Sequence, residues 1–158
     1  RLKFVRVRYC CWSKGNISQA QTDCECRMMI SISKFKDEDM DHLMNMIYNR
    51  DLNSSLANDL PEHGYIAFCN MAPVAVGFLR ICESDLAIMD SVMTNPQFES
   101  EIRHWALEGI ISALMDDARH FGIKKILAYS IDDGIRKRAK SFGFKELPQV
   151  LMCAEVGD

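Results

Sequence analysis

Residues 74–96 read VAVGFLRIC ESD LAIMDSVMT NP, two apolar runs that are separated by a short polar turn and ended by Asn-Pro. Runs of this length that are rich in Val, Ile and Leu predict strands. A further apolar run lies just upstream at Tyr65–Cys69, joined to the first by the turn-forming residues Asn70–Pro73. The segment therefore predicts an antiparallel hairpin, Tyr65–Cys69 with Val74–Cys82, followed by a third strand at Leu86–Met93.

Downstream of these strands the apolar spacing changes from strand to helix. Apolar residues keep a helical spacing from Phe98 to Phe121, and Gly122 follows as a helix stop. Lys124–Ile131 then predicts a buried strand, Asp132–Phe142 a short basic helix that Gly143 breaks, and Val150–Val156 a last strand.

Upstream of the hairpin, Met29–Phe35 alternates apolar and polar residues and predicts a half-buried strand. The acids at Asp37–Asp39 then open a helix, and a second short helix runs from Asn53 to Pro61. A hairpin combined with a strand-helix-strand crossover predicts an α+β, or mixed α/β, fold around one central sheet.

Composition limits the function classes. A chain of 158 residues suits one domain, and no apolar run approaches the roughly 18 residues of a membrane span. The net charge of −3 argues against a general nucleic-acid binder. An odd total of seven cysteines is not typical of a secreted disulfide framework, so we expect a reducing, cytoplasmic location.

The first 27 residues differ from the rest because they are basic and lack a helical period. We expect an N-terminal extension of unclear role at residues 1–27, followed by a single domain at residues 28–158. A basic arm that touches nucleic acid or a partner is the alternative. This segment contains four cysteines, Cys10, Cys11, Cys24 and Cys26. Zinc binding is an alternative for them, but their spacing departs from that of zinc knuckles, so we predict no metal site.

Several short motifs, in order, resemble the GNAT superfamily of acyl-CoA-dependent N-acetyltransferases across about four-fifths of the chain. They are the strand Val76-Gly77-Phe78-Leu79, the strand end at Asn95-Pro96, the helix end Asp117–Gly122, and Ser141-Phe142-Gly143-Phe144. The resemblance implies a central mixed sheet with antiparallel N-terminal strands, a β-α-β crossover and flanking helices. It also implies acetyl-CoA as cosubstrate and an amine, in a small molecule or a protein, as acceptor.

The family's acyl-CoA loop, Q/R-x-x-G-x-G/A, precedes its long helix, where glycines let backbone amides reach the pyrophosphate. Counting back from Ala118 places that motif near residues 102–107, which contain no glycine. The resemblance then implies a cofactor-binding set of side chains and strand backbone: Arg103, His104, Trp105 and Ala106, with Val92, Met93 and Thr94 pairing to the pantetheine arm. Alternatively, Arg103 and His104 lie on a solvated helix face.

The catalytic candidates are a base and an acid. A carboxylate on or beside the central strands would take the ammonium proton, and Asp90 is the first choice, with Glu83 as the second. Asp90 facing solvent is the alternative. The family's usual tyrosine acid is replaced by Ala139, and Tyr129 is the nearest tyrosine in sequence, with core packing as its other interpretation.

Two classes of function therefore stay open. One is an N-acetyltransferase that works by direct attack of the amine on acetyl-CoA. The other is a catalytically inactive structural or interaction protein on the same fold, because GNAT-like internal or morphogenesis proteins of tailed phages have similarly eroded loops. Methionines such as Met40 and Met44 suit an adaptable interface or ordinary core filling. A homodimer is compatible with the sequence, whereas a membrane partner is not expected.

Overall fold

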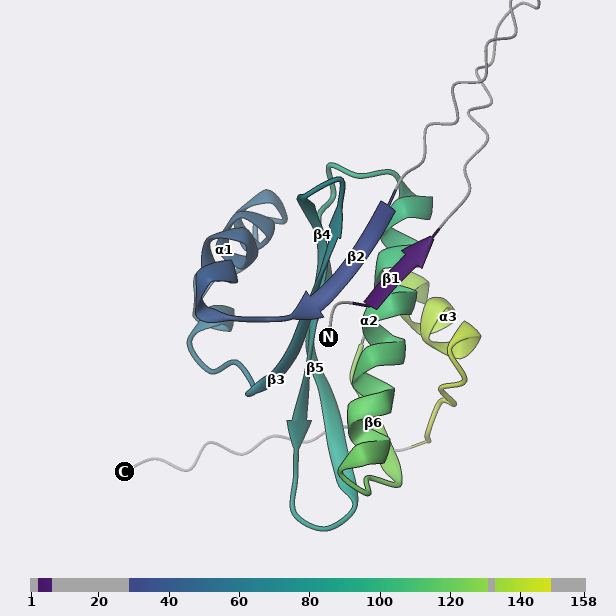
Figure 1. Cartoon of the computed structure of the whole chain (residues 1–158). Coiled ribbons are helices and arrows are strands. Elements are labelled where there is room, and N and C mark those ends of the chain that lie inside the picture. The colour runs from purple at the N-terminus through teal and green to yellow at the C-terminus, as the bar shows by residue number, and fades with distance from the viewer. Residues whose placement is uncertain (1–2, 7–28, 131–132, 149–158) are drawn as a thin grey trace, which may run out of the picture. The chain divides into compact units, whose positions relative to one another are not determined.

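The computed structural model describes residues 3–6, 29–130 and 133–148. The chain divides into two compact units, residues 1–128 and 129–158. In order, the elements are β1 (Lys3–Arg6), β2 (Met29–Lys34), the 3-10 turn η1 (Asp37–Asp39), α1 (Met40–Asn49), the 3-10 turn η2 (Ser54–Ala57), β3 (His63–Cys69), β4 (Ala72–Ile81), β5 (Leu86–Thr94), α2 (Ser100–His120), β6 (Lys125–Ala128) and α3 (Asp133–Ser141) (Figure 1).

One mixed sheet forms the centre of the first unit. Its strand order is β1-β2-β3-β4-β5-β6; neighbours are antiparallel from β1 to β5, whereas β6 runs parallel to β5. The parallel step requires a crossover, which α2 provides. The predicted α+β architecture with antiparallel N-terminal strands and a β-α-β crossover is therefore confirmed.

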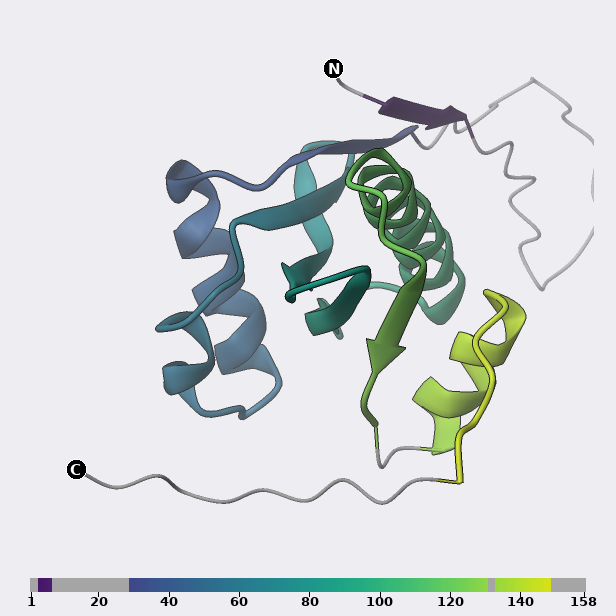
Figure 2. The same ribbon diagram turned by 90° about the horizontal axis from the view of Figure 1, so that it is seen from below.

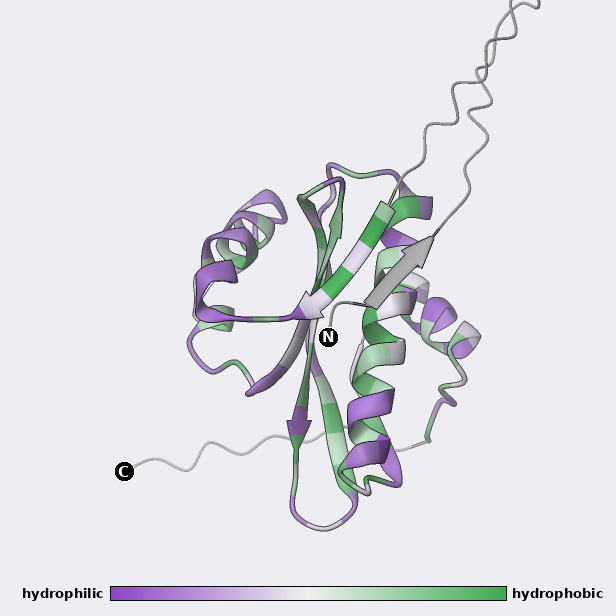
Figure 3. Cartoon of the chain, in the orientation of Figure 1, coloured by the Kyte–Doolittle hydropathy of each residue, from purple (hydrophilic) through white to green (hydrophobic). Residues whose placement is uncertain are grey.

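The two helices of this unit cover opposite faces of the sheet (Figure 2). On one face, α1 contributes Leu43, Met46 and Ile47 to a buried cluster with Phe78 and other strand residues, Ile66, Val76 and Met93. On the other face α2 approaches closely, because a Cβ on Gly77 would lie 3.0 Å from Cγ2 of Ile110. Figure 3 shows the matching pattern, with apolar residues on the central strands and polar residues on the outer side of α1.

The β3–β4 hairpin turn is tighter than the sequence indicated. Only Asn70 and Met71 lie outside the strands, and both have positive φ, 48° and 68°. A two-residue hairpin turn of type I′ requires this conformation at both positions, and Asn adopts it readily. Ala72 and Pro73, which we expected in the turn, therefore already belong to β4.

Other boundaries also differ from expectation. Residues 37–39 form a 3-10 turn, so the first α-helix begins at Met40. The strand expected at Lys124–Ile131 is limited to the four residues of β6, none of them buried, because its pairing with β5 covers only Leu86–Met89. From the expected N-terminal extension, Lys3–Arg6 pairs with β2 as β1. The domain boundary at residue 28 stays a prediction.

Some expected features lie outside the described residues, namely the last strand at Val150–Val156, the four N-terminal cysteines and Cys153. Within the second unit, α3 ends where Gly143 takes a φ of 89°, as its sequence predicted. Among the helices that can be described, none has a stretch long and apolar enough to cross a membrane.

Candidate functional site

The sheet opens where β5 and β6 part. Their pairing ends at Met89 opposite Ala128, while β5 continues to Thr94. Among the described residues, Asp90–Thr94 therefore has no strand neighbour on the β6 side. Unpaired N–H and C=O groups along such an edge are ready to pair with another extended group.

A β-bulge bends β5 within this open segment. The register passes from Phe78 opposite Asp90 to Val76 opposite Met93, so that Ser91 and Val92 both oppose Gly77. Ser91 has a φ of 47°, a left-handed conformation that is strained for a residue with a side chain. Strained backbone of this kind is concentrated at functional sites, and here it lies at the point where β5 loses β6.

Asp90, the first predicted base, lies directly before the bulge. It is opposite Phe78 and therefore on the face of the sheet that α1 covers. Its Oδ2 accepts hydrogen bonds from Nε and Nη2 of Arg80 at 3.2 and 3.1 Å, and its Oδ1 accepts one from Ser91 Oγ at 3.1 Å. The side chain stays 34% exposed, so a substrate can reach it, but a substrate amine would have to share these oxygens with Arg80.

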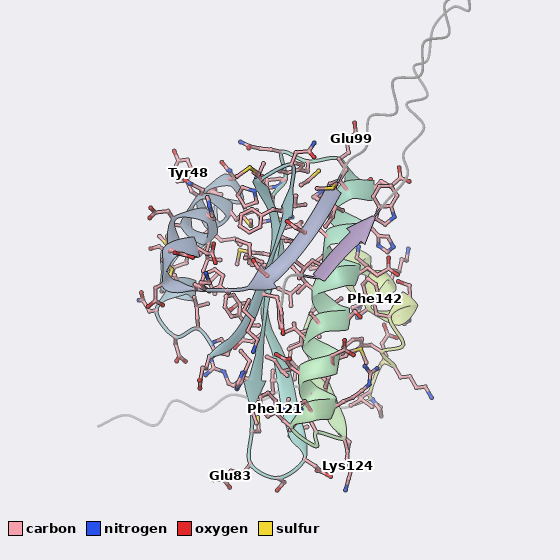
Figure 4. All side chains as sticks on the ribbon, viewed as in Figure 1. Tyr48, Glu83, Glu99, Phe121, Lys124 and Phe142 are labelled. Atoms are coloured by element: carbon pink, nitrogen blue, oxygen red, sulfur yellow. The ribbon has the colours of Figure 1, made fainter. Side chains whose placement is uncertain are left out.

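Glu83 does not lie beside Asp90. Glu83 is exposed in the β4–β5 turn, at the opposite end of the sheet from Glu99 (Figure 4). Asp90 lies four residues beyond Leu86, the first residue after that turn, which is about 13 Å along a strand. Tyr129 belongs to the second unit and is 52% exposed, so it does not pack in a core.

The predicted pantetheine-pairing residues have different environments. Val92 is half-buried, whereas Met93 and Thr94 are buried. Arg50, which directly follows α1, donates from Nε to the carbonyl oxygen of Thr94 and from Nη2 to its Oγ1, both at 2.6 Å. The end of the open segment is therefore already bonded to a side chain from the α1 side.

The loop that follows β5 lies upstream of the position that the sequence indicated. It runs from Asn95 to Glu99, and α2 begins at Ser100. The amide of Arg103 already donates to the carbonyl of Glu99, so helical hydrogen bonding begins there. Residues 103–106 lie inside the helix, and Ala106 is fully buried. Their backbone donors are in use, which leaves only side chains for any contact with a cosubstrate.

The pattern Gln97-x-x-Ser100-x-Ile102 therefore occupies the place of the expected Q/R-x-x-G-x-G/A loop. The predicted set Arg103–Ala106 lies within α2, and its role in binding a cosubstrate stays a prediction. Neither Ser100, which is exposed, nor Ile102, which is buried, is a glycine. Glu99 and Glu101 add negative charge at the same helix end.

Arg103 has a side-chain donor without a hydrogen-bond partner among the described residues. This donor is Nε, which is buried. A buried N–H without a partner costs about 1–3 kcal/mol, which an anionic ligand at the start of α2 would recover. The donor set therefore fits a phosphate in part: the Arg103 side chain favours it, whereas Glu99 and Glu101 oppose it.

Two further chemistries find no support in the described part of the chain. There, no group of three or more His, Cys, Asp or Glu side chains is placed to hold a metal ion. Cys69 is buried, and that burial raises the pKa of its thiol, which disfavours the thiolate that a nucleophile needs.

Solved structures of acetyltransferases share this architecture. The aminoglycoside acetyltransferase AAC(6')-Iy, in complex with a CoA bisubstrate analogue, superposes with a TM-score of 0.61 at 13% identity, over 81% of this chain and 99% of that one. The ribosomal-protein-S18-alanine N-acetyltransferase of Escherichia coli gives 0.64 at 14% identity, over 75% and 79% of the two chains. The chain has the GNAT fold.

A third structure with the GNAT fold is a predicted acetyltransferase from Clostridium acetobutylicum with acetyl-CoA, at a TM-score of 0.59 and 18% identity over 80% of this chain and 96% of that one. No family model and no curated protein matches the sequence. Identities this low establish the fold alone, so the roles of individual residues stay predictions.

Proposed function

We propose that the protein binds an acyl-CoA, with acetyl-CoA as the expected cosubstrate, in the opening beside β5 and transfers the acyl group to an amine. The observation that carries the proposal is the open edge of β5 after Met89, bent by the bulge at Ser91. An extended pantetheine arm has amide groups that suit such an edge. Structures with the same fold that contain CoA or acetyl-CoA add support.

In this reaction the amine lone pair attacks the thioester carbonyl carbon. The C–N bond forms, the C–S bond breaks, and the sulfur leaves with the electron pair as a thiolate. Asp90 is the proposed acceptor of the ammonium proton because it lies beside the bulge and is partly exposed. Holding the two reactants in line supplies most of the acceleration in such a site.

The other predicted residues are proposed to contribute either to CoA binding or to proton transfer. Arg103 is the proposed contact for the diphosphate, because its buried Nε lacks a hydrogen-bond partner among the described residues. His104 and Trp105 are half-buried on the same helix, and both already take part in contacts. Glu83 and Tyr129 stay as predicted alternatives for the base and the acid, to be tested by the same turnover measurements as Asp90.

A catalytically inactive binding protein on the same fold is the second candidate. It is favoured by the loop at 97–102, which has no glycine and two carboxylates, and by the bonds from Arg50 to Thr94. Both features favour the binding of a CoA diphosphate less than a glycine-rich loop at this place would.

Calorimetric titration with acetyl-CoA separates the two candidates. If the cleft is used, the protein binds acetyl-CoA, and Arg103→Ala weakens binding roughly tenfold or more, as expected for loss of a charge-assisted bond. Arg119→Ala is the matched control, since Arg119 is exposed near the other end of α2 and pairs with Asp116. No heat and no thermal shift at about 1 mM acetyl-CoA would favour the inactive protein.

A further inference from the structure

Charge is distributed very unevenly along this chain. Of its 22 acidic and 19 basic residues, twelve acids and two bases lie in residues 37–101, which leaves ten acids and seventeen bases elsewhere. No lysine occurs between Lys36 and Lys124. The part of the protein that contains α1, η2 and β3–β5 is therefore strongly acidic, although the whole chain has a net charge of only −3.

The two basic residues of that segment form bonds toward the sheet. Arg50 bonds to Thr94 at the end of β5. Arg80 bonds to Asp90 and also to the carbonyl oxygen of Asp59 at 2.7 Å. Their charges are thus engaged close to the strands, while carboxylates such as Asp41 and Asp51 are exposed.

The outer side of α1 and η2 also exposes large apolar side chains. Met44 and Tyr48 are one helical turn apart, so they lie on the same side of α1, beside the buried face that contains Leu43 and Ile47. Tyr48 is 84% exposed and points away from the fold (Figure 4). Leu52, whose amide closes the end of α1 onto Ile47, and Leu56 in η2 are both 43% exposed.

We propose that this α1–η2 face, defined by Met44, Tyr48, Leu52 and Leu56 with Asp41 and Asp51 among them, docks a basic protein segment that carries apolar side chains. Single exposed apolar residues are ordinary, but four of them on one helix and the turn after it form a surface that a partner can cover. The charge identifies the partner, because lysines or arginines complement the carboxylates that surround the apolar side chains.

The same charges argue against other occupants. A two-fold contact between copies would place this acidic face against itself, which is repulsive. Anionic lipid surfaces attract basic segments and would repel this one. The inference goes beyond the proposed acyl transfer and does not require it, since docking needs neither acetyl-CoA nor an intact cleft.

Fluorescence anisotropy with the full chain, without acetyl-CoA, tests the proposal. The probe is a labelled peptide with the sequence Lys-Lys-Leu-Gly-Lys-Phe repeated twice; one control peptide has Ser for Leu and Phe, and another has Glu for Lys. We expect the protein to bind the probe but neither control peptide. Added salt should weaken the binding because it screens exposed charges. Met44→Ser/Tyr48→Ser should weaken it about tenfold, since aromatic and Met side chains dominate such contacts.

Met71→Ser is the matched control, because Met71 is 91% exposed but lies in the β3–β4 turn, and it should change affinity less than about twofold. Asp41→Asn/Asp51→Asn should also weaken binding, whereas Glu83→Gln/Glu108→Gln, two exposed acids elsewhere, should not. Absence of binding, equal losses in the control variants, or equal affinity for the Ser peptide would each overturn the proposal. So would a dimer that Met44→Ser/Tyr48→Ser dissociates, or tighter binding to phosphatidylserine vesicles.

Discussion

Gly64→Ala tests how tightly the α1 side of the sheet is packed. A Cβ at this position would lie 2.3 Å from Cδ1 and 2.4 Å from Cε1 of Phe78, and 3.3 Å from Cβ of Phe35. Phe78 is only 1% exposed and sits in the cluster that joins α1 to the strands, so its ring has no free space to enter. The new methyl group must therefore displace the ring or the strand.

The size of the effect follows from two opposing terms. Overpacking a well-filled core typically costs about 1–3 kcal/mol, and a 2.3 Å overlap with an immobilised ring belongs at the upper end. Replacing Gly by Ala also stabilises the folded state by about 0.4–1 kcal/mol, because it lowers the conformational entropy of the unfolded chain. We expect a net loss of about 2 kcal/mol in the free energy of unfolding, which lowers Tm by about 4–8 °C for a chain of this length.

Gly77→Ala is the matched comparison on the other face. There a Cβ would lie 3.0 Å from Cγ2 of Ile110 and 3.4 Å from Cγ2 of Val92, so small shifts suffice and the loss should stay below about 1 kcal/mol. Urea unfolding at one pH measures both variants. Replacing Phe78 by Leu should destabilise the Gly64→Ala protein less than the wild type. Equal effects of the two glycine variants, or additive effects of Gly64→Ala and Phe78→Leu, would refute the reasoning.

The remaining predictions concern other regions. Asp51→Gly should raise the free energy of unfolding by about 1 kcal/mol in urea unfolding, because Asp51 ends α1 with a φ of 54° and places an acid at a helix C-terminus; no gain would contradict this. Burial and the hydrogen bond to Asp117 raise the pKa of Tyr65 to about 12, so its neutral form stabilises the fold fully below pH 10 and loses this effect as pH rises toward 12. Between pH 9 and 11 the wild type should therefore lose about 1 kcal/mol more stability than Tyr65→Phe, and parallel pH profiles would exclude this. If the enzyme proposal holds, Asp90→Asn should lower kcat at least tenfold with little change in the Kd for acetyl-CoA, and unchanged turnover would remove Asp90 as the base.

Local patterns were sufficient to predict most of the fold. Apolar residues alternate with polar ones at Met29–Lys34 and recur at helical spacing along α2, because each element buries one side. Strand and helix could therefore be assigned from the spacing of apolar residues. The hairpin turn was predicted too long because it depends on a left-handed conformation at Met71. Methionine rarely adopts this conformation, so the residue type does not predict it. The short β6 was also missed, since its length depends on how far β5 stays beside it.

The candidate site was harder to predict because its contacts join residues far apart in sequence. Arg50 and Thr94 are 44 residues apart, and neither side of that bond has a local motif. The motif that the sequence placed at residues 102–107 lies inside α2, which begins at Ser100. Counting back from Ala118 assumes a fixed helix length, whereas the end of β5 fixes where the helix can begin.

The two arginines of the acidic segment connect the proposed cleft with the proposed docking face. Arg50 joins the end of α1 to the end of β5, and Arg80 joins Asp59 to Asp90. These bonds hold both guanidinium groups beside the strands, whereas Asp41 and Asp51 stay exposed. A basic acceptor segment that docks on α1–η2 would thus approach Asp90 from the side of the sheet that Asp90 faces. If the basic peptide binds and acetyl-CoA does not, the same surface instead supports a protein that only binds, because docking depends on none of the residues of the 97–102 loop.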